Sequence, residues 1–171
     1  MAFTKVLIAN RGEIACRIMA TAHDLGYRTV AIYSEADSGA PHVQMADQAV
    51  CIGPAPVAEP YLNVAAILDA AARTGADAVH PGYGFLAENA DFAKSCADAG
   101  LTFIGPSPQA IELMGNKRLA KLRMEEAEVP CVPGYSGADQ DADVLAAAGE
   151  RIGFPLMVKA ASGGGGRGMR L

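Results

Sequence analysis

Residues 5–33, KVLIANRGEIACRIMATAHDLGYRTVAIY, decide the fold because they contain a strand, a helix and a second strand in direct succession. The apolar run Lys5 to Ala9 predicts a buried strand. From Glu13 to Leu25, apolar side chains recur at helical spacing, at Ile14, Ile18, Ala22 and Leu25. Gly26 suits the position just after a helix, and Thr29 to Tyr33 predicts the next strand.

The same order of helix, glycine and short strand returns twice further along the chain. The two later units are Val64 to Arg73 before a strand at 78–80, and Ala90 to Ala99 before a strand at 101–104. Repeated crossover helices of this kind are typical of a parallel sheet. We therefore expect an α/β fold, with a Rossmann-like parallel sheet in the first part of the chain.

The composition excludes several classes of protein. The 171 residues carry 14 Lys and Arg against 19 Asp and Glu, and 51% of them are hydrophobic. An acidic balance gives no reason to expect nucleic acid, and no apolar stretch is long enough for a membrane span. The N-terminus lacks a signal-peptide pattern. Four cysteines without metal-site spacing indicate reduced thiols and a cytoplasmic location.

The pattern changes after Gly105. Helices are predicted around 111–114, from Lys117 to Ala127 and over 143–152, with prolines between them. We expect a first domain at 1–114, a linker and helix at 115–134, and the beginning of a second domain at 135–171. Because the chain stops three residues after Gly168, we expect it to be part of a longer protein.

Residues 155–171, PLMVKAASGGGGRGMRL, predict a loop that contacts phosphate. A short apolar strand at 156–158 leads to Lys159, and consecutive glycine amides can form an anion site. The order of residues fits neither a Walker loop, in which Lys follows the glycines, nor the dinucleotide fingerprint, which follows the first strand. The alternative is a flexible linker, against which the flanking apolar residues argue.

Three other places have both a functional and a structural interpretation. His80 to Leu86, HPGYGFL, follows a strand, where open α/β sheets bind ligands, but it is equally compatible with a structural turn. Lys117 in the first turn of a helix suits a bound anion, or is simply exposed. Asn10 to Glu13 caps the first helix or contacts ligand, and the structural role is favoured.

Seven stretches of the chain stand out when taken in order. They are IANRGEIACRI (8–18), CIGPAP (51–56), HPGYGFLAEN (80–89), FIGPS (103–107), LMGNK (113–117), VPCVPG (129–134) and KAASGGGGRGM (159–169). Together they resemble the N-terminal part of the biotin carboxylase component of biotin-dependent carboxylases, as in acyl-CoA carboxylase α subunits and pyruvate carboxylase. The resemblance covers essentially the whole chain and rests on the order of the stretches.

The resemblance implies a pre-ATP-grasp domain followed by the start of an ATP-grasp domain, with roles for particular residues. Tyr83 matches a tyrosine near the biotin pocket, and Arg17 and Asp24 fall on the helix of the family's dimer contact. The positions that match ATP contacts are Lys117, Lys159, Gly165, Gly166 and Met169. Catalytic residues and metal ligands are expected beyond Leu171, so the chain alone should not catalyse.

The implied reaction is carboxylation of biotin on a carrier domain. Bicarbonate attacks the γ-phosphate of ATP, with Mg²⁺ or Mn²⁺, to give carboxyphosphate, whose CO₂ is transferred to N1 of biotin. The implied partners are the biotin carboxyl carrier, a carboxyltransferase and a second copy of the chain. The final acceptor, and whether these parts are fused, do not follow from the sequence.

The sequence departs from the family pattern at a few positions. Ala87 stands where Ser is usual and Asn116 where Asp or Ser is common, while Ala20 and Asp24 replace an Arg and a Glu of some relatives. Three alternatives stay open: another ATP-grasp ligase such as a carbamoyl phosphate synthetase half, a non-catalytic dimerisation or nucleotide-binding module, and a dehydrogenase, which the missing glycine fingerprint disfavours.

Overall fold

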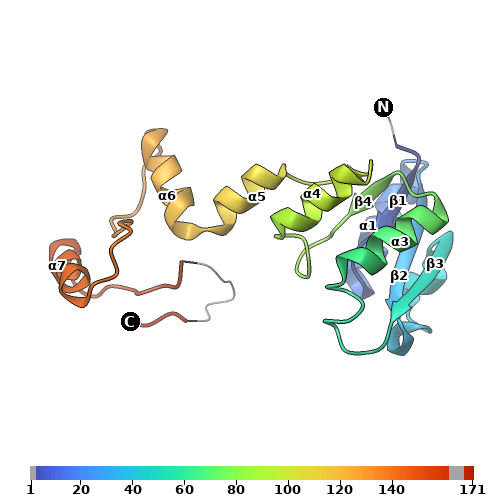
Figure 1. The fold of residues 1–171 in the computed structure, drawn as a ribbon, viewed down its shortest axis with the longest axis horizontal. Helices are drawn as coiled ribbons and strands as arrows, with labels where there is room; N and C mark the ends of the chain where they lie inside the picture. The colour runs from blue at the N-terminus through green and yellow to red at the C-terminus, as the bar shows by residue number, and fades with distance from the viewer. Residues whose placement is uncertain (1–2, 162–167) are drawn as a thin grey trace. The chain divides into compact units, whose positions relative to one another are not determined.

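The computed structural model of the chain describes residues 3–161 and 168–171. Its described residues divide into two compact units, 1–111 and 112–171, which we treat separately. The first unit is built on a five-stranded sheet (Figure 1). Its strands are β1 (Lys5–Ile8), β2 (Arg28–Ser34), β3 (Gln48–Gly53), β4 (Ala78–His80) and β5 (Thr102–Phe103).

All neighbouring strands are parallel, in the order β3-β2-β1-β4-β5. Parallel neighbours cannot be joined by a tight hairpin, so helices must connect them across the faces of the sheet. The helices are α1 (Gly12–Asp24), α2 (Pro41–Met45), α3 (Val64–Thr74) and α4 (Ala90–Asp98), with a short 3₁₀ turn η1 (Glu35–Asp37). The predicted α/β class with a parallel sheet is confirmed.

The two faces of the sheet form two separate cores. Leu7 of β1 packs with residues of α3 and α4, including Ile67 and Phe92, and Figure 1 shows α3 in front of the sheet. Val6 and Ile8, one position before and after Leu7, pack with Ala15 and Met19 of α1. Because side chains alternate along a strand, a strand between two helical layers is apolar on both faces.

The buried side of α1 differs from the predicted stripe. The buried residues are Ile14, Ala15, Met19 and Ala22, whereas Leu25 is 67% exposed. Leu25 is the residue after the last helical turn, and it lines the same apolar groove as Ile14, Ile18 and Ala22. Ala15, fully buried, is a small residue on the face that meets the sheet, which suits close approach of the helix. The four predicted residues therefore share one side of α1, but Leu25 at the end of the stripe is exposed rather than buried.

Two elements between residues 41 and 53 were not predicted from the sequence. β3 is an edge strand in which only Val50 is buried, so it lacks the apolar run that marks the central strands. α2 has five residues, too few for helical periodicity to be recognised. The remaining predicted helices and sheet strands agree with the structure to within a few residues at their ends.

The second unit has helices but few buried residues. α5 (Pro108–Gly115) spans the boundary, and α6 (Lys117–Glu126) and α7 (Ala142–Ile152) follow. Within the described part of this unit only Ala148 and Gly149 are buried. Residues just before α6 and α7 stabilise these helices by capping them. The Asn116 side chain accepts hydrogen bonds from the Arg118 and Leu119 amides of α6, and the Asp141 side chain accepts one from the Asp143 amide of α7.

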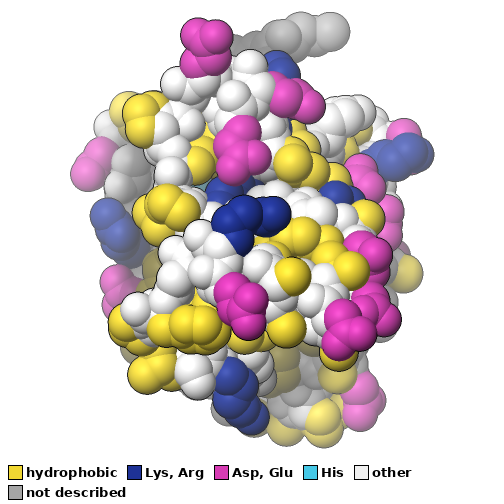
Figure 2. Space-filling view, turned by 90° about the vertical axis from the view of Figure 1, so that its left-hand side faces the viewer, with side chains coloured by type: hydrophobic (Ala, Val, Ile, Leu, Met, Phe, Trp, Pro, Cys, Tyr) yellow, Lys and Arg dark blue, Asp and Glu magenta, His cyan; other side chains and the backbone are white. Residues whose placement is uncertain are grey.

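The surface is mixed in character. On the face that Figure 2 shows, acidic, basic and hydrophobic side chains intermingle. The molecule carries a net charge of −5, and this mixture is typical of a globular protein surface. Among the helices in the described ranges, none is both long and apolar enough to span a bilayer.

Asp77 fastens the amino-terminal ends of β1 and β4. Its carboxylate accepts hydrogen bonds from the Lys5 amide at 2.7 Å and from the Thr4 amide and hydroxyl, each at 2.9 Å. Burial alone raises the pKa of Asp77, but the hydrogen bonds from Lys5 and Thr4 outweigh burial and hold the pKa below its ordinary value. The charged carboxylate therefore stabilises the folded state.

We expect Asp77→Ala to lower the free energy of unfolding by about 1–3 kcal/mol at pH 7, because two backbone amides lose their acceptor. Since the folded-state pKa is depressed, this stabilisation is present above the unfolded pKa of about 3.9 and is lost as the pH falls below it. Urea denaturation at pH 7 and at pH 3 measures both effects. Asp69→Ala, at an exposed ion pair with Arg73 on α3, serves as the control and should change stability little. Equal stability of wild type and Asp77→Ala at pH 7 would contradict this role.

Candidate functional site

The candidate ligand-binding region of the first unit lies at the carboxyl ends of its central strands. β1 is flanked by β2 on one side and β4 on the other: the chain moves outward from β1 through β2 to β3, then returns to the other side of β1 as β4. In open α/β sheets, ligands bind at such a point, beyond the carboxyl ends of the strands. Asn10 and Arg11 follow β1 there, and the loop of residues 81–85 follows β4.

Asn10 joins these two segments. Its side-chain amide donates to the carbonyl oxygens of Pro81 and Tyr83, both at 2.9 Å, and its Oδ1 accepts from the Arg11 amide at 2.9 Å. Asn10 is 5% exposed, so these hydrogen bonds are shielded from water. The sequence favoured a structural role for residues 10–13. The structure shows such a role for Asn10, which holds the loop after β4 rather than capping α1.

His80 and Gly82 set the shape of the loop after β4. The Gly82 amide donates to Nδ1 of His80 at 3.0 Å, so Nδ1 acts as the acceptor. Burial lowers the pKa of His80, which keeps the imidazole neutral at pH 7. Gly82 has a φ of +66°, and a Cβ atom there would lie 2.7 Å from Nδ2 of Asn10. The geometry therefore supports the structural interpretation of His80.

A second polar network lies at the ends of β1 and β2. The Tyr61 hydroxyl donates to Asp37 at 2.6 Å and accepts from the Ser34 amide at 2.9 Å, while Arg11 forms an ion pair with Asp37 at 3.2 Å. Burial, together with the hydrogen bond to Asp37, raises the pKa of Tyr61 to about 12. Burial alone raises the pKa of Asp37, but hydrogen bonds from Tyr61 and Ser34 and the charge of Arg11 hold that pKa below its ordinary value. Sequence reasoning missed Asp37 and Tyr61, which lie in no recognisable motif.

This network also supports the far end of the loop after β4. The ring of Phe85 is stacked on Tyr61, with centroids 5.2 Å apart and planes 9° from parallel. Phe85 has a φ of +43°, a conformation that is costly for a bulky side chain. The loop is thus held by Asn10 at one end and by Tyr61 at the other. Between them Tyr83 is 67% exposed and available to a ligand.

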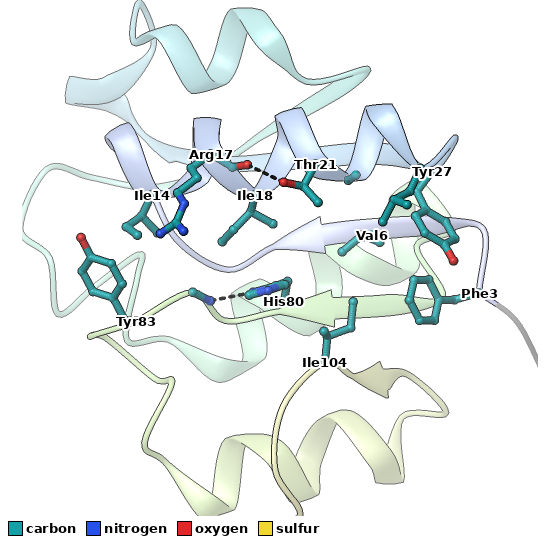
Figure 3. A pocket seen from close by; sticks show the side chains of 13 residues that line it. Phe3, Val6, Ile14, Arg17, Ile18, Thr21, Tyr27, His80, Tyr83 and Ile104 are labelled. Carbon is teal, nitrogen blue, oxygen red and sulfur yellow. Dashed lines mark hydrogen bonds between the residues drawn. The ribbon is translucent and has the colours of Figure 1, made fainter.

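An apolar groove of about 410 Å³ lies beside this loop (Figure 3). Its apolar lining comes from α1, β1, the residues just before β1 and β2, and the segment after β5, and it includes Phe3, Val6, Ile18, Tyr27 and Ile104. Arg17, His80 and Tyr83 lie at one end, where Figure 3 shows the Arg17 side chain extending from α1 toward the loop. Asp24, seven residues and about two helical turns from Arg17, is exposed on the same side of α1.

In the second unit, the ends of the glycine-rich stretch are paired. Val158 and Arg170 form an antiparallel bridge, with N–H to O distances of 2.8 and 3.0 Å. Lys159 and Met169 are therefore the residues next to this bridge, Lys159 exposed and Met169 half-buried, and we use the word hairpin for the described residues 156–161 and 168–171 alone. The predicted strand at 156–158 is wrong, because only Val158 is paired. Gly165 and Gly166, the predicted nucleotide-loop glycines, lie outside the described residues.

The start of α6 is tied to this hairpin. The Lys117 amide donates to the Ala161 carbonyl at 2.9 Å, and Oδ1 of Asn116 accepts from the Arg118 and Leu119 amides at 3.0 and 3.1 Å. The structure thus connects the segments of the two predicted phosphate-binding lysines, Lys117 and Lys159. The amides of residues 117–119 are already paired, so an anion at this helix end would be held by side-chain ammonium groups rather than by those backbone donors.

Two family models match the chain. Residues 2–111 match the biotin carboxylase N-terminal domain, and residues 116–171 match the ATP-binding domain of the carbamoyl-phosphate synthase L chain. The α subunit of mitochondrial methylcrotonoyl-CoA carboxylase from Oryza sativa subsp. japonica is 59% identical over 170 residues, covering 99% of this chain. The α chain of mitochondrial propionyl-CoA carboxylase from Rattus norvegicus is 54% identical over 169 residues, covering 99%. The chain spans 23% of the length of each of these relatives.

Solved structures share the fold. The biotin carboxylase domain dimer of the 2-oxoglutarate carboxylase of Hydrogenobacter thermophilus, in complex with MgADP, ADP and bicarbonate, has a TM-score of 0.94 and 52% identity. The alignment covers 99% of this chain and 37% of that one. The biotin carboxylase of Campylobacter jejuni, in a β-γ-ATP complex, has a TM-score of 0.95 and 47% identity, covering 99% and 38% of the two chains.

The loop after β4 offers a matched pair of glycine substitutions. In Gly82→Ala, the new Cβ would lie 2.7 Å from Asn10 Nδ2 and 2.8 Å from Ile14 Cγ2, at a positive φ. We expect a loss of about 2–4 kcal/mol in the free energy of unfolding, from backbone strain and overpacking together. Gly84→Ala has a similar φ of +71° but no atom within 4 Å, so about 1 kcal/mol is expected. Chemical denaturation compares the two variants, and equal losses would show that the contact between Gly82 and Asn10 is loose.

Proposed function

Because the chain belongs to the biotin carboxylase N-terminal domain family, we propose that it is the N-terminal part of a biotin carboxylase. This enzyme uses MgATP and bicarbonate to carboxylate biotin on a carrier domain. The observation that carries the proposal is the hydrogen bond between Lys117 and Ala161, which connects two lysine-bearing segments beside the glycine-rich hairpin. The complex of the Hydrogenobacter thermophilus relative with MgADP and bicarbonate supports the same ligands.

We place ATP against the second unit. Lys117 and Lys159 neutralise phosphate charge, Gly165 and Gly166 belong to the loop that covers the phosphates, and Met169 lies near the adenine. A glycine-rich cover of this kind excludes water while fixed charges stabilise the transferred phosphoryl group. Among the described residues no cluster of His, Cys, Asp or Glu could hold a metal ion.

We place biotin near Tyr83 of the first unit. The loop that carries Tyr83 lies at the carboxyl end of the sheet and is held at both ends, while Tyr83 itself is exposed. The exposed ring offers a flat apolar face and a hydroxyl group to a bicyclic ligand. The carrier domain that presents biotin and the carboxyltransferase that receives the carboxyl group are the proposed partners.

For the final acceptor of the carboxyl group and for the cellular location of the protein, we turn to the names of the relatives. The rice and rat relatives are named for methylcrotonoyl-CoA and propionyl-CoA, so an acyl-CoA is the acceptor we favour over pyruvate. Those relatives are named as mitochondrial, whereas the sequence predicts a cytoplasmic protein with reduced cysteines. The four cysteines are free in the structure. Cell fractionation followed by immunoblotting decides between these compartments.

A second candidate activity is that of a carbamoyl phosphate synthetase. It is favoured by the match of residues 116–171 to the ATP-binding domain of that enzyme. Phosphate release from ATP by the complete protein, with bicarbonate, separates the two activities. Stimulation by free biotin supports the carboxylase, and stimulation by ammonia supports the synthetase. A third possibility, a non-catalytic dimerisation or nucleotide-binding module, predicts no ATP cleavage under either condition.

Lys159→Ala tests the ATP site in the complete protein. We expect the KM for MgATP to rise about tenfold or more, since a hydrogen bond to a charged group contributes about 1.5–3 kcal/mol. Lys94→Ala is the control, because Lys94 is an exposed residue of α4 that forms an ion pair with Asp98, and its loss should leave this KM unchanged. An unaltered KM in Lys159→Ala would remove Lys159 from the site. The 171-residue chain by itself is expected to show no biotin-stimulated phosphate release.

The proposed homodimer is tested by charge reversal on α1. Arg17→Glu and Asp24→Lys each place the opposite charge at an exposed position of the predicted contact, so each should weaken self-association. Sedimentation velocity of the complete protein measures the fraction of dimer, with Lys94→Glu on α4 as the control. An unchanged dimer fraction in both α1 variants would place the contact elsewhere.

A further inference from the structure

We propose that Asn10 is a positioning residue for Tyr83, and that its side-chain amide determines how tightly the site binds biotin. This inference rests on the proposed function, because it uses biotin as the ligand of Tyr83. Asn10 does not contact the ligand in this proposal. It acts through the backbone of the loop that carries Tyr83.

The side chain of Asn10 is fully used in holding this loop. An asparagine amide has two N–H donors, and both are given to the loop, one to Pro81 and one to Tyr83. Its oxygen accepts from the Arg11 amide, which fixes the orientation of the amide group. With 5% exposure, water cannot easily replace these bonds. Asn10 thus connects the ends of β1 and β4 through buried hydrogen bonds.

The loop is packed closely against Asn10. The Gly82 amide is bound to Nδ1 of His80, and the Gly82 Cα lies so close to Asn10 that a Cβ would overlap its Nδ2. The three consecutive residues 81–83 are therefore each fixed at the backbone or by contact. Because the backbone of Tyr83 is held in place, the starting point of its side chain is held as well.

The Tyr83 side chain has little else to hold it. The residue is 67% exposed, and within the described residues no hydrogen bond or ring stack restrains its ring. Its position relative to a ligand is consequently set mainly by the backbone that Asn10 holds. A displacement of about 1 Å in a positioning element is enough to weaken binding or rate substantially.

The chemistry requires an amide at position 10. In Asn10→Asp the shape is kept, but a carboxylate oxygen would face two carbonyl oxygens and repel both. In Asn10→Ser one shorter donor remains, so part of the restraint survives. Asn63→Ala provides the control, because the Asn63 side-chain oxygen accepts a hydrogen bond from the backbone amide of Ala66 at the start of α3, away from the loop.

The experiment measures biotin-stimulated phosphate release by the complete protein and its three variants. For Asn10→Asp we expect the KM for free biotin to rise at least tenfold, with a smaller rise for Asn10→Ser, while the KM for MgATP stays within twofold of wild type. Asn63→Ala should alter neither constant. This difference between substrates separates positioning of Tyr83 from general destabilisation, which would raise both constants or lower the amount of active enzyme.

Hydrogen exchange at residues 80–87, followed by mass spectrometry, provides a readout that does not need activity. We expect faster exchange there in both Asn10 variants and unchanged exchange in Asn63→Ala. If wild type shows no response to biotin, the proposed function fails, and the exchange data alone decide whether Asn10 holds the loop. If the loop exchanges faster but the KM for biotin is unchanged, or if the KM for MgATP rises equally, the positioning role is overturned.

Discussion

The central constraint on the first unit is that β1 is hydrogen-bonded on both edges and covered on both faces. It pairs in parallel with β2 through residues 5–8 and with β4 through residues 6–8. Leu7 faces one helical layer, and Val6 and Ile8 face the other. A strand enclosed in this way leaves no side or edge for polar function. Every functional group must therefore be placed at its ends.

The two ends of β1 are used differently. At the amino-terminal end, Asp77 fastens Thr4 and Lys5 and contributes only to stability. At the carboxyl end, Asn10 and Arg11 contact the loops that follow the two neighbouring strands. Asn10 forms a hydrogen bond with Tyr83 after β4, and Arg11 forms an ion pair with Asp37 after β2. Buried hydrogen bonds dominate there, since the Arg11 ion pair is partly exposed and such pairs contribute little. The result is a rigid support beneath an exposed Tyr83.

The second unit is organised on another principle. Its described residues include almost no buried core, and its helices are stabilised by Asn116 and Asp141 at their amino-terminal ends. The hairpin closed by Val158 and Arg170 and the hydrogen bond from Lys117 to Ala161 provide its local order. Segments with few buried contacts are the ones that open most easily in proteins. Under the function proposed above, the well-packed first unit binds biotin and the loosely packed second unit binds ATP, which suits an enzyme that closes over its nucleotide.

Much of this followed from the sequence because it depends on local patterns. Apolar runs, helical spacing and glycines such as Gly26 and Gly75, which adopt positive φ, are legible one segment at a time. Seven short stretches in the right order led to the family, which the match over residues 2–111 confirms. The edge strand β3 and the five-residue α2 were missed, because neither carries a strong periodic signal.

The tertiary structure alone decided which distant residues act together. Asn10 and Tyr83 are 73 positions apart, and Asp37 and Tyr61 are 24 apart, yet each pair is joined by a hydrogen bond. No sequence pattern encodes these pairs, because they arise when parallel strands bring their carboxyl ends to one edge of the sheet. Residue types and local elements were determined by the sequence itself. The hydrogen bond from Asn10 to the Tyr83 backbone exists only because the folded sheet places β1 beside β4.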